Sequence, residues 1–206
     1  MPDASPSKQD VSRSLRSDAA ANRDRILSAA AAVLGHDGER VPMARIAHQA
    51  GVGVGTLYRH YPTRRALWAA LTTRSFQLVL HHARAAAHSS ESALSALGQF
   101  FEQTIAARDD LILPLHGGPV VDDPTVAALR TEIRTQIGHV LTRGRRDGTI
   151  RPDVTPTDII ITGAMLAQPL PTAENWDKLA RRQAEIYIAG LSAHKASRSS
   201  SHGGVA

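Results

Sequence analysis

The sequence predicts an all-α fold of about nine helices with no convincing strand. In most segments between positions 18 and 194, apolar residues recur at a spacing of three and four. Proline, glycine and Asp-Gly breaks separate these segments. Within Gly51–Tyr61, a glycine turn lies between two short helical patterns. We therefore expect an N-terminal three-helix unit that contains a helix-turn-helix, joined by a long helix to a larger helical C-terminal domain.

The first helix is predicted to be capped by Ser17 or Asp18 and to end near Gly38. Residues 1–17 are rich in Ser, Pro and Asp and lack periodicity, so they are predicted to be a disordered arm. The arginines of this arm leave two interpretations open. They belong either to a solvated tail or to a basic arm that contacts DNA.

The helix-turn-helix is predicted from the spacing around Gly51. Residues 43–50 carry apolar side chains at i, i+3, i+4 and i+7, which gives a short helix with one apolar face. Gly51 follows directly, where a left-handed C-cap conformation is needed and glycine adopts it without steric cost. A second short helix begins near Val54, and its Leu57 and Tyr61 are expected to face the partner helices.

The second short helix has side chains suited to the major groove. A helix that enters the groove brings its first residues close to base edges, and Val54, Gly55 and Thr56 are small enough for that approach. The residues predicted to contact DNA bases or phosphates are Arg45, Val54, Gly55, Thr56, Tyr58, Arg59, His60 and Arg64.

The positive charge of the chain is concentrated around this motif. The net charge is +5, yet residues 40–90 alone contain seven arginines and no acidic residue. Such a block favours binding to a polyanion, because each neutralised phosphate releases condensed counterions. An ordinary solvated basic face is the alternative, and the coincidence with the helix-turn-helix argues against it.

After the motif, Thr63 is predicted to cap a long helix over 64–88 that connects the two domains. His81, His82 and His88 on this helix are candidate metal ligands by residue type. Their spacing lacks an i, i+4 pair and no carboxylate is near, so no metal is predicted. No cofactor is predicted either.

The C-terminal part is predicted to contain further helices with short breaks. Thr155 and Asp158 form a capping-box pattern with Pro156 at the first helical position. The helix that follows is apolar around most of its circumference, which indicates burial on several sides, either in a monomeric core or against a second chain. The predicted segments are a helix after Ser90, a short apolar piece Leu111–Leu115, and helices over 124–148, 159–168 and 173–194, with a disordered tail over 195–206.

The motif residues resemble the DNA-binding domain of the tetracycline-repressor (TetR) family. The matching positions are Ile46-Ala47, Gly51-Val52, the run 55–61 (Gly-Thr-Leu-Tyr-Arg-His-Tyr) and Pro62-Thr63-Arg64. Two positions depart from the family pattern. Gly53 stands where many members have a serine N-cap, and Ala44 stands where some have a base-contacting arginine.

The resemblance implies a DNA-binding domain over 18–62 and a regulatory and dimerisation domain over 63–194. The run 148–154 followed by a capped helix is similar to many actinobacterial C-terminal domains of the family. By this resemblance the chain is a dimeric repressor, released from a palindromic operator by an unknown small-molecule effector. Candidate pocket residues, each of which also fits plain core, are Phe76, Leu80, Phe100, Phe101, Leu113, His116 and Met165.

Two other classes of function compete with a ligand-responsive repressor. An enzyme is disfavoured, because the glycines at 51, 53 and 55 follow a helix rather than the strand of a dinucleotide-binding loop, and no Gly-x-Ser-x-Gly nucleophile elbow occurs. A ligand-independent, architectural DNA-binding protein is the second alternative. The chain has neither cysteine nor a membrane-spanning apolar run, which favours a cytoplasmic protein.

Overall fold

The computed structural model describes residues 8–37, 41–113, 122–170 and 173–193, with side chains except at 8–19 and 35–37. These residues form eight α-helices and one 3-10 helix. The elements are α1 (Lys8–Asp37), α2 (Met43–Gln49), α3 (Val54–His60), α4 (Arg64–His88), α5 (Ala93–Ala106), η1 (Arg108–Asp110), α6 (Pro124–Arg146), α7 (Pro156–Leu166) and α8 (Trp176–Leu191). The described residues contain no β-strand, only one isolated antiparallel bridge between Ile150 and Ser192. The predicted all-α fold is therefore confirmed.

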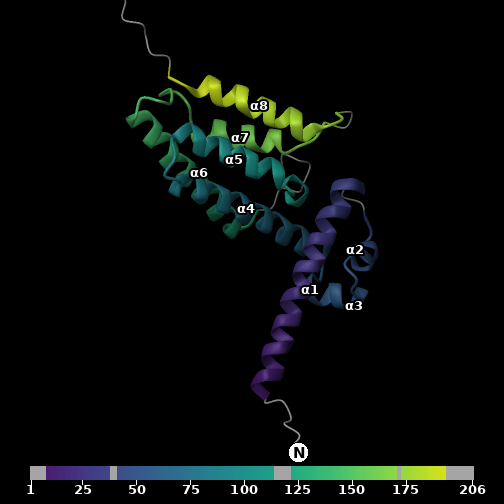
Figure 1. The fold of residues 1–206 in the computed structure, drawn as a ribbon. Coiled ribbons are helices and arrows are strands. Elements are labelled where there is room, and N and C mark those ends of the chain that lie inside the picture. Colours follow the sequence, from purple (N-terminus) through teal and green to yellow (C-terminus); the bar gives the residue numbers. More distant parts are fainter. Residues whose placement is uncertain (1–7, 38–40, 114–121, 171–172, 194–206) are drawn as a thin grey trace, which may run out of the picture.

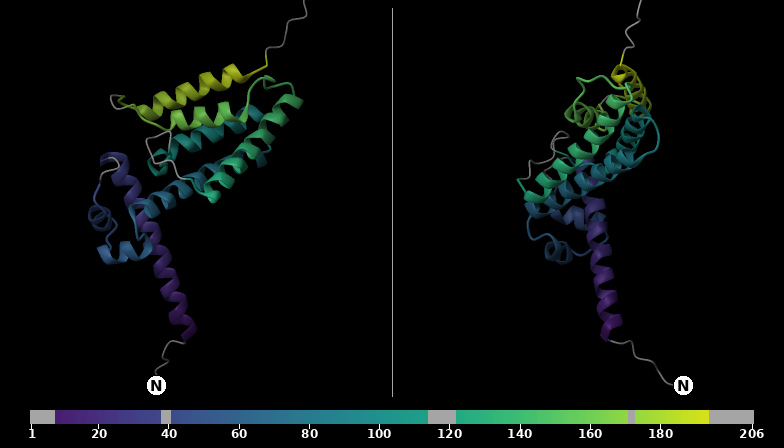
Figure 2. Two further views of the ribbon diagram at one scale, coloured as in Figure 1. Left: turned by 180° about the vertical axis from the view of Figure 1, so that it is seen from behind. Right: turned by 90° about the vertical axis from the view of Figure 1, so that its left-hand side faces the viewer.

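The helices form two groups at opposite ends of α4 (Figures 1 and 2). Helices α2 and α3 lie beside the C-terminal half of α1, next to the beginning of α4. Helices α5 and α6 pack on α4, and α7 and α8 cover α5 on the side away from α4. The chain thus consists of a head, α1–α3, and a body, α5–α8, joined by one helix.

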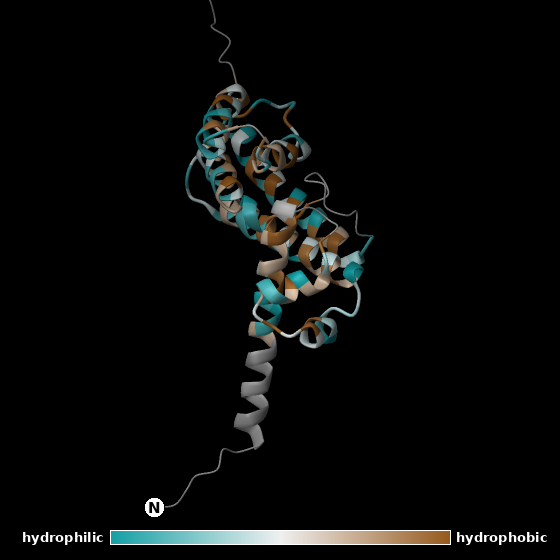
Figure 3. Ribbon diagram, turned by 90° about the vertical axis from the view of Figure 1, so that its right-hand side faces the viewer, coloured by the Kyte–Doolittle hydropathy of each residue, from teal (hydrophilic) through white to brown (hydrophobic). Residues whose placement is uncertain are grey.

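Two separate hydrophobic cores correspond to the head and the body. Leu67 and Leu71, near the start of α4, belong to the head core together with residues of α1, α2 and α3. Val79 and Ala83, further along the same helix, belong to the body core. Figure 3 shows apolar and polar residues interspersed along the helices of both groups. Helix α4 therefore contributes one end to each core.

Most of the predicted helix starts are confirmed by their capping contacts. The Thr63 side chain accepts a hydrogen bond from the backbone N–H of Ala66 at the start of α4. Asp123 caps α6, and Thr155 and Asp158 form a complete capping box at the start of α7. Hydrogen bonds from the Thr155 backbone and side chain hold the pKa of the Asp158 carboxyl below its ordinary value.

Several predicted boundaries are wrong. Helix α1 begins at Lys8, so the prediction of a disordered arm fails for residues 8–17; residues 1–7 lie outside the described residues. No glycine or proline interrupts the chain between positions 7 and 34, and a helix already nucleated extends at little cost. The helix predicted after Ser90 is confirmed as α5, which Ser92 caps. Helix α8 begins after Asn175, whose φ of 59° lies in the left-handed region.

The connection between α6 and α7 closes against the end of α8. Gly148 adopts a φ of +66° in the predicted Asp-Gly turn. The backbone N–H of Arg151 then donates to the Leu191 carbonyl at 3.0 Å. Ile150 is buried in this turn, directly against Gly144 of α6. The close packing leaves no space for a side chain at position 144.

Replacing each of two helical glycines by alanine is predicted to change the free energy of unfolding in opposite directions. A Cβ at Gly144 would lie 2.6 Å from Ile150 Cδ1 and 2.9 Å from Ala93 Cβ. Gly144→Ala should therefore lower the free energy of unfolding by about 1–3 kcal/mol. A Cβ at Gly98 of α5 meets nothing within 4 Å, so Gly98→Ala should raise it by about 0.5–1 kcal/mol through helix propensity alone. Urea denaturation of both variants checks the pair, and equal shifts would contradict this packing.

Candidate DNA-binding surface and ligand pocket

The turn between α2 and α3 has the predicted geometry. Gly51 has a φ of +63°, which confirms its role as the left-handed end of α2. Its backbone N–H donates to the His48 carbonyl, and that of Val52 donates to the Ala47 carbonyl, both at 3.0 Å. Gly53 is the N-cap of α3 and supplies no side-chain hydrogen bond. These contacts fix the direction in which α3 leaves the turn.

Helix α3 has one buried face and one exposed face. Leu57 is completely buried and Tyr61 is 5% exposed, so their predicted packing against the other helices of the head is confirmed. Burial also raises the pKa of the Tyr61 hydroxyl. On the opposite face Val54 and Tyr58 are 43% and 45% exposed. Large side chains this exposed are available to a partner.

The other predicted DNA-contacting residues lie around this exposed face. The Arg59 guanidinium donates a hydrogen bond of 2.9 Å to the Thr56 hydroxyl, which orients both side chains. Gly55 and Arg45 are exposed and His60 is half-buried. Arg64 donates to the backbone carbonyl of Val41, a contact that ties the start of α4 to the chain before α2. DNA contact by these residues remains a prediction.

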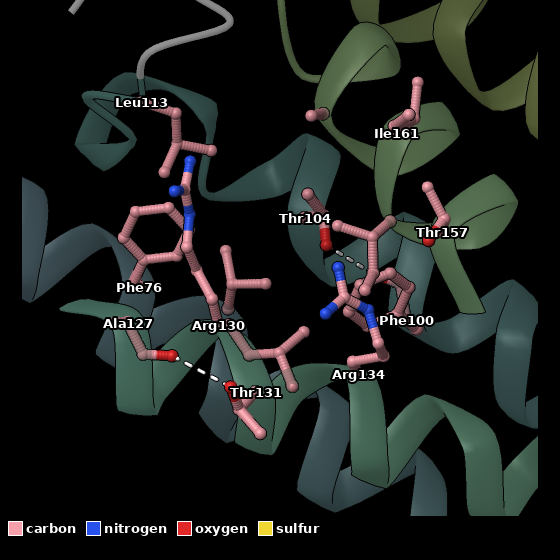
Figure 4. A pocket seen from close by; sticks show the side chains of 14 residues that line it. Phe76, Phe100, Thr104, Leu113, Ala127, Arg130, Thr131, Arg134, Thr157 and Ile161 are labelled. Atoms are coloured by element: carbon pink, nitrogen blue, oxygen red, sulfur yellow. Dashed lines mark hydrogen bonds between the residues drawn. The ribbon is translucent and has the colours of Figure 1, made fainter. Parts of the chain in front are cut away.

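A pocket of about 500 Å³ lies in the body between α4, α5, α6 and α7. Three of the seven predicted pocket residues line it, namely Phe76, Phe100 and Leu113. Figure 4 shows Phe76 and Leu113 at one side of the pocket and Phe100 at another. Val79, Ile133 and Ile160 extend the apolar wall.

The other pocket predictions are not supported by the structure. Leu80 and Phe101 are buried in the body core, one helical position beyond the lining residues Val79 and Phe100. Since successive helical residues point about 100° apart, one position decides between wall and core. Met165 is 61% exposed on α7 and does not line the pocket. His116 lies outside the described residues.

The polar lining of the pocket was not predicted. Arg130 and Arg134 line it from successive turns of α6, and the lining also contains the threonines 104, 131 and 157. The Arg130 guanidinium carbon lies 5.2 Å from the centre of the Phe76 ring, a cation–π contact (Figure 4). The sequence does contain a signal for this arginine pair: two like charges at i and i+4 lie on one helix face, where they repel each other.

A short segment connects the pocket to the head. Arg74 of α4 donates hydrogen bonds to Ser28 of α1 at 3.0 Å and to Asp110 of η1 at 3.2 Å. Two residues after Asp110, the backbone N–H of Ile112 donates to the buried Ser75 hydroxyl at 2.8 Å. Ile112 packs against the head core. The next residue is Leu113 in the pocket wall.

Large apolar side chains are exposed on α7 and α8. On α7 these are Ile161 at 47% and Met165 at 61%, and on α8 Leu179 at 47% and Ile186 at 50%. Leu179 and Ile186 are seven residues apart, which places them on one face of α8. A second hollow, of about 510 Å³, also borders Ile186. This surface is too apolar to be ordinary solvent-facing helix.

The rings of His81 and His82 lie edge to face, with their centroids 5.8 Å apart. His82 is buried and its pKa is lowered by burial and by neighbouring His81, whereas the His88 ring contacts the Arg84 carbonyl one turn earlier. Within the residues that the structure describes, no three His, Asp or Glu side chains form a possible metal site. The described helices include none that is long and apolar enough to cross a membrane.

Helices throughout the described residues, a helix-turn-helix at one end and a pocket in a separate helical body together are typical of a ligand-responsive transcription regulator. The model of the family described as bacterial regulatory proteins, tetR family, matches residues 26–71. The model described as transcriptional regulator SbtR-like, C-terminal domain, matches residues 89–193, more than half of the chain. The chain belongs to the TetR family.

Individual relatives agree with this family. A TetR transcription regulatory protein from Mycobacterium vanbaalenii is 29% identical, covers 86% of this chain and 99% of its own, and superposes with a TM-score of 0.62. A TetR transcriptional regulator from Streptomyces coelicolor is 26% identical, covers 84% and 99%, and has a TM-score of 0.56. An HTH-type transcriptional regulator from Staphylococcus aureus (strain USA300) is 36% identical over 69 residues, 33% of this chain and 37% of that relative. This match spans little more than a third of the curated relative's length.

The turn glycines are predicted to differ in what they tolerate. Gly51→Ala forces a Cβ into the left-handed region at φ +63° and should cost about 1–2 kcal/mol of stability. Gly51→Asn should recover much of that loss, since asparagine tolerates this conformation. Gly53 has φ −66° at an N-cap without a side-chain acceptor, so Gly53→Ser should stabilise by a few tenths of a kcal/mol. Thermal unfolding distinguishes the three variants, and a stable Gly51→Ala protein would refute the turn geometry.

Proposed function

We propose that this chain is a homodimeric repressor that binds a palindromic operator and is released from it by a small-molecule effector. The observation that carries the proposal is the exposed face of α3, on which Val54 and Tyr58 are open to a partner while Leu57 anchors the helix from behind. Such a protein acts on chromosomal DNA in the cytoplasm.

The charge around α3 supports DNA as the partner. No acidic residue occurs between Glu39 and Glu91, so nothing in α2, α3 or α4 repels phosphates. Thr56 and Arg59 are already oriented by their mutual hydrogen bond. Side chains held in place before binding lose less conformational entropy on contact with DNA.

The exposed apolar face of α7 and α8 supports dimerisation. A second copy that packs on this face would bury Met165, Leu179 and Ile186, and each large apolar side chain removed from water contributes about 1.5–3 kcal/mol. Gly190, with open space around its Cα, would allow close approach of a second helix. Two heads held in this way can reach half-sites about 34–36 Å apart.

The segment 110–113 supports coupling between effector and operator. A ligand that pushes on Leu113 would displace a segment whose other contacts, through Ile112, Ser75 and Arg74, reach the head. The ligand must bind more tightly to the protein when the heads are arranged so that they do not fit DNA. DNA binding then weakens ligand binding by the same factor by which the ligand weakens DNA binding. Selecting bound sequences from a random duplex pool, and then screening compounds for release, tests the proposal as a whole. A pool without enrichment would refute it.

Single substitutions on α3 test the DNA surface. Tyr58→Ala and His60→Ala should each weaken operator binding about tenfold, which corresponds to loss of one contact worth about 1–2 kcal/mol. Thr56→Ala should alter sequence preference more than total affinity.

Far-UV circular dichroism should stay unchanged, because these side chains are not part of the buried core. His139→Ala, at an exposed position of α6, is the control. Electrophoretic mobility shifts at several salt concentrations provide the measurement, and affinity that hardly changes with salt would count against phosphate contact.

A charge on the apolar face tests the dimer. Ile186→Asp should yield a monomer in sedimentation velocity, because a carboxylate cannot be buried in an apolar interface without a partner. Operator binding should fall with it. Thr135→Asp adds the same charge to an exposed position of α6 and should leave the dimer intact. If Ile186→Asp remains dimeric, the interface lies elsewhere.

A further inference from the structure

The pocket in the body has a charge pattern that restricts its ligand. Its lining contains two arginines, Arg130 and Arg134, and no acidic side chain. Neither guanidinium has an ion-pair partner among the residues that the structure describes. The pocket is therefore electropositive.

The two arginines are placed as a pair. Because they are four residues apart on α6, they lie on adjacent turns of one helix face, about 5–6 Å apart at Cβ. Like charges at this spacing destabilise a helix by a few tenths of a kcal/mol unless an anion lies between them. Glu132, which lies between them in sequence, faces Arg84 of α4 at 3.6 Å and does not compensate them.

The remaining lining is mostly apolar. Phe76 and Phe100 contribute aromatic surface, and Val79, Ile133 and Ile160 contribute aliphatic surface. Among the lining hydroxyls, those of Thr104 and Thr131 donate to backbone carbonyls of their own helices. Both arginines are exposed residues, whereas Val79, Phe100 and Ile133 are buried. The charged groups are therefore more open to solvent than these apolar groups, and Figure 4 shows Arg130 beside Phe76 and Leu113 and Arg134 beside Phe100.

We propose that this pocket binds an amphipathic carboxylic acid, with the carboxylate held between Arg130 and Arg134 and the apolar body against Phe100 and Ile133. The inference rests on the proposed function only in taking this ligand as the effector. A guanidinium can donate two parallel hydrogen bonds to a carboxylate, which gives direction as well as affinity. The Arg130 side chain is already held over the Phe76 ring, so it loses less freedom on binding.

A cationic ligand does not fit this pocket. It would face two guanidinium groups without any carboxylate in the lining. A neutral apolar ligand fits the base but leaves the arginine pair uncompensated. A volume of about 500 Å³ falls within the usual range of roughly 300–1,000 Å³ for small-molecule sites. The matched chemistry is one anionic head and one compact apolar body.

Calorimetric titration of the full chain tests the ligand class. The probes are straight-chain carboxylates from butanoate to dodecanoate, the alcohols of the same lengths, decyltrimethylammonium and decanoyl-coenzyme A. At least one carboxylate should bind at least about tenfold more tightly than its alcohol, since a charge-assisted hydrogen bond contributes about 1.5–3 kcal/mol. Absence of binding by the whole carboxylate series, or equal affinity for alcohols, overturns the proposal. Tighter binding of the cation also overturns it.

Variants identify the arginines as the cause. Arg130→Gln and Arg134→Gln should each weaken carboxylate binding about tenfold and leave alcohol binding unchanged. Arg146→Gln removes the same charge from the exposed end of α6 and should change neither. Unchanged carboxylate affinity in both pocket variants refutes the assignment. If only decanoyl-coenzyme A binds in an arginine-dependent way, the anion is a phosphate and the carboxylate assignment is wrong.

The ligand class and the proposed function can fail separately. Mobility shifts with a selected operator show whether the bound carboxylate releases DNA. Arginine-dependent carboxylate binding without release would retain the ligand class and refute the effector role. Release of the operator by an alcohol or a cation, without carboxylate binding, would do the reverse.

Discussion

The structure depends on a single constraint: helix α4 belongs to two hydrophobic cores at once. Its first turns hold Leu67 and Leu71 in the head, and its later turns hold Val79 and Ala83 in the body. Close-packed interiors do not deform smoothly, so a helix anchored in both cores moves as a rigid element or not at all. A displacement of α4 against α5 and α6 must therefore change the position of the head. This makes α4 the mechanical basis of any communication between the pocket and α3.

The segment after η1 is a second connection between the pocket and the head, and it depends on the backbone conformation of this segment. Leu111 leaves η1 in an extended conformation, and successive side chains of an extended chain point in opposite directions. Ile112 accordingly packs against the head core while Leu113 lines the pocket. The hydrogen bond from Ile112 to Ser75 fixes the segment on α4. Two adjacent residues, Ile112 and Leu113, thus connect the head core to the pocket wall.

Local rules predicted the head better than the body. The left-handed Gly51, the Thr63 cap and the buried Leu57 follow from conformational preference and spacing within a few residues, so the sequence was sufficient. The pocket depends on how four helices rotate against one another, which a spacing pattern does not fix. The spacing pattern therefore does not separate Phe101 and Leu80, which are buried in the core, from their neighbours Phe100 and Val79, which line the pocket. Helix α1 starts earlier than its serine-rich composition predicts, because no glycine or proline interrupts the chain there.

The arginines of the body show why the pocket pair stands apart. Most others engage acceptors within the body: Arg108 pairs with Asp177 of α8, Arg181 with Glu102 at 2.9 Å, and Arg143 donates to the Ala87 carbonyl at 3.1 Å. These contacts join helices, so the charges of these arginines contribute to holding the fold together. Arg130 and Arg134 join no two helices by an ion pair within the described residues, and Arg130 makes a cation–π contact with Phe76. Contacts within the body therefore account for Arg108, Arg143 and Arg181 but not for Arg130 and Arg134. An anion bound from solution would give these two arginines the charge partner that the others find inside the chain.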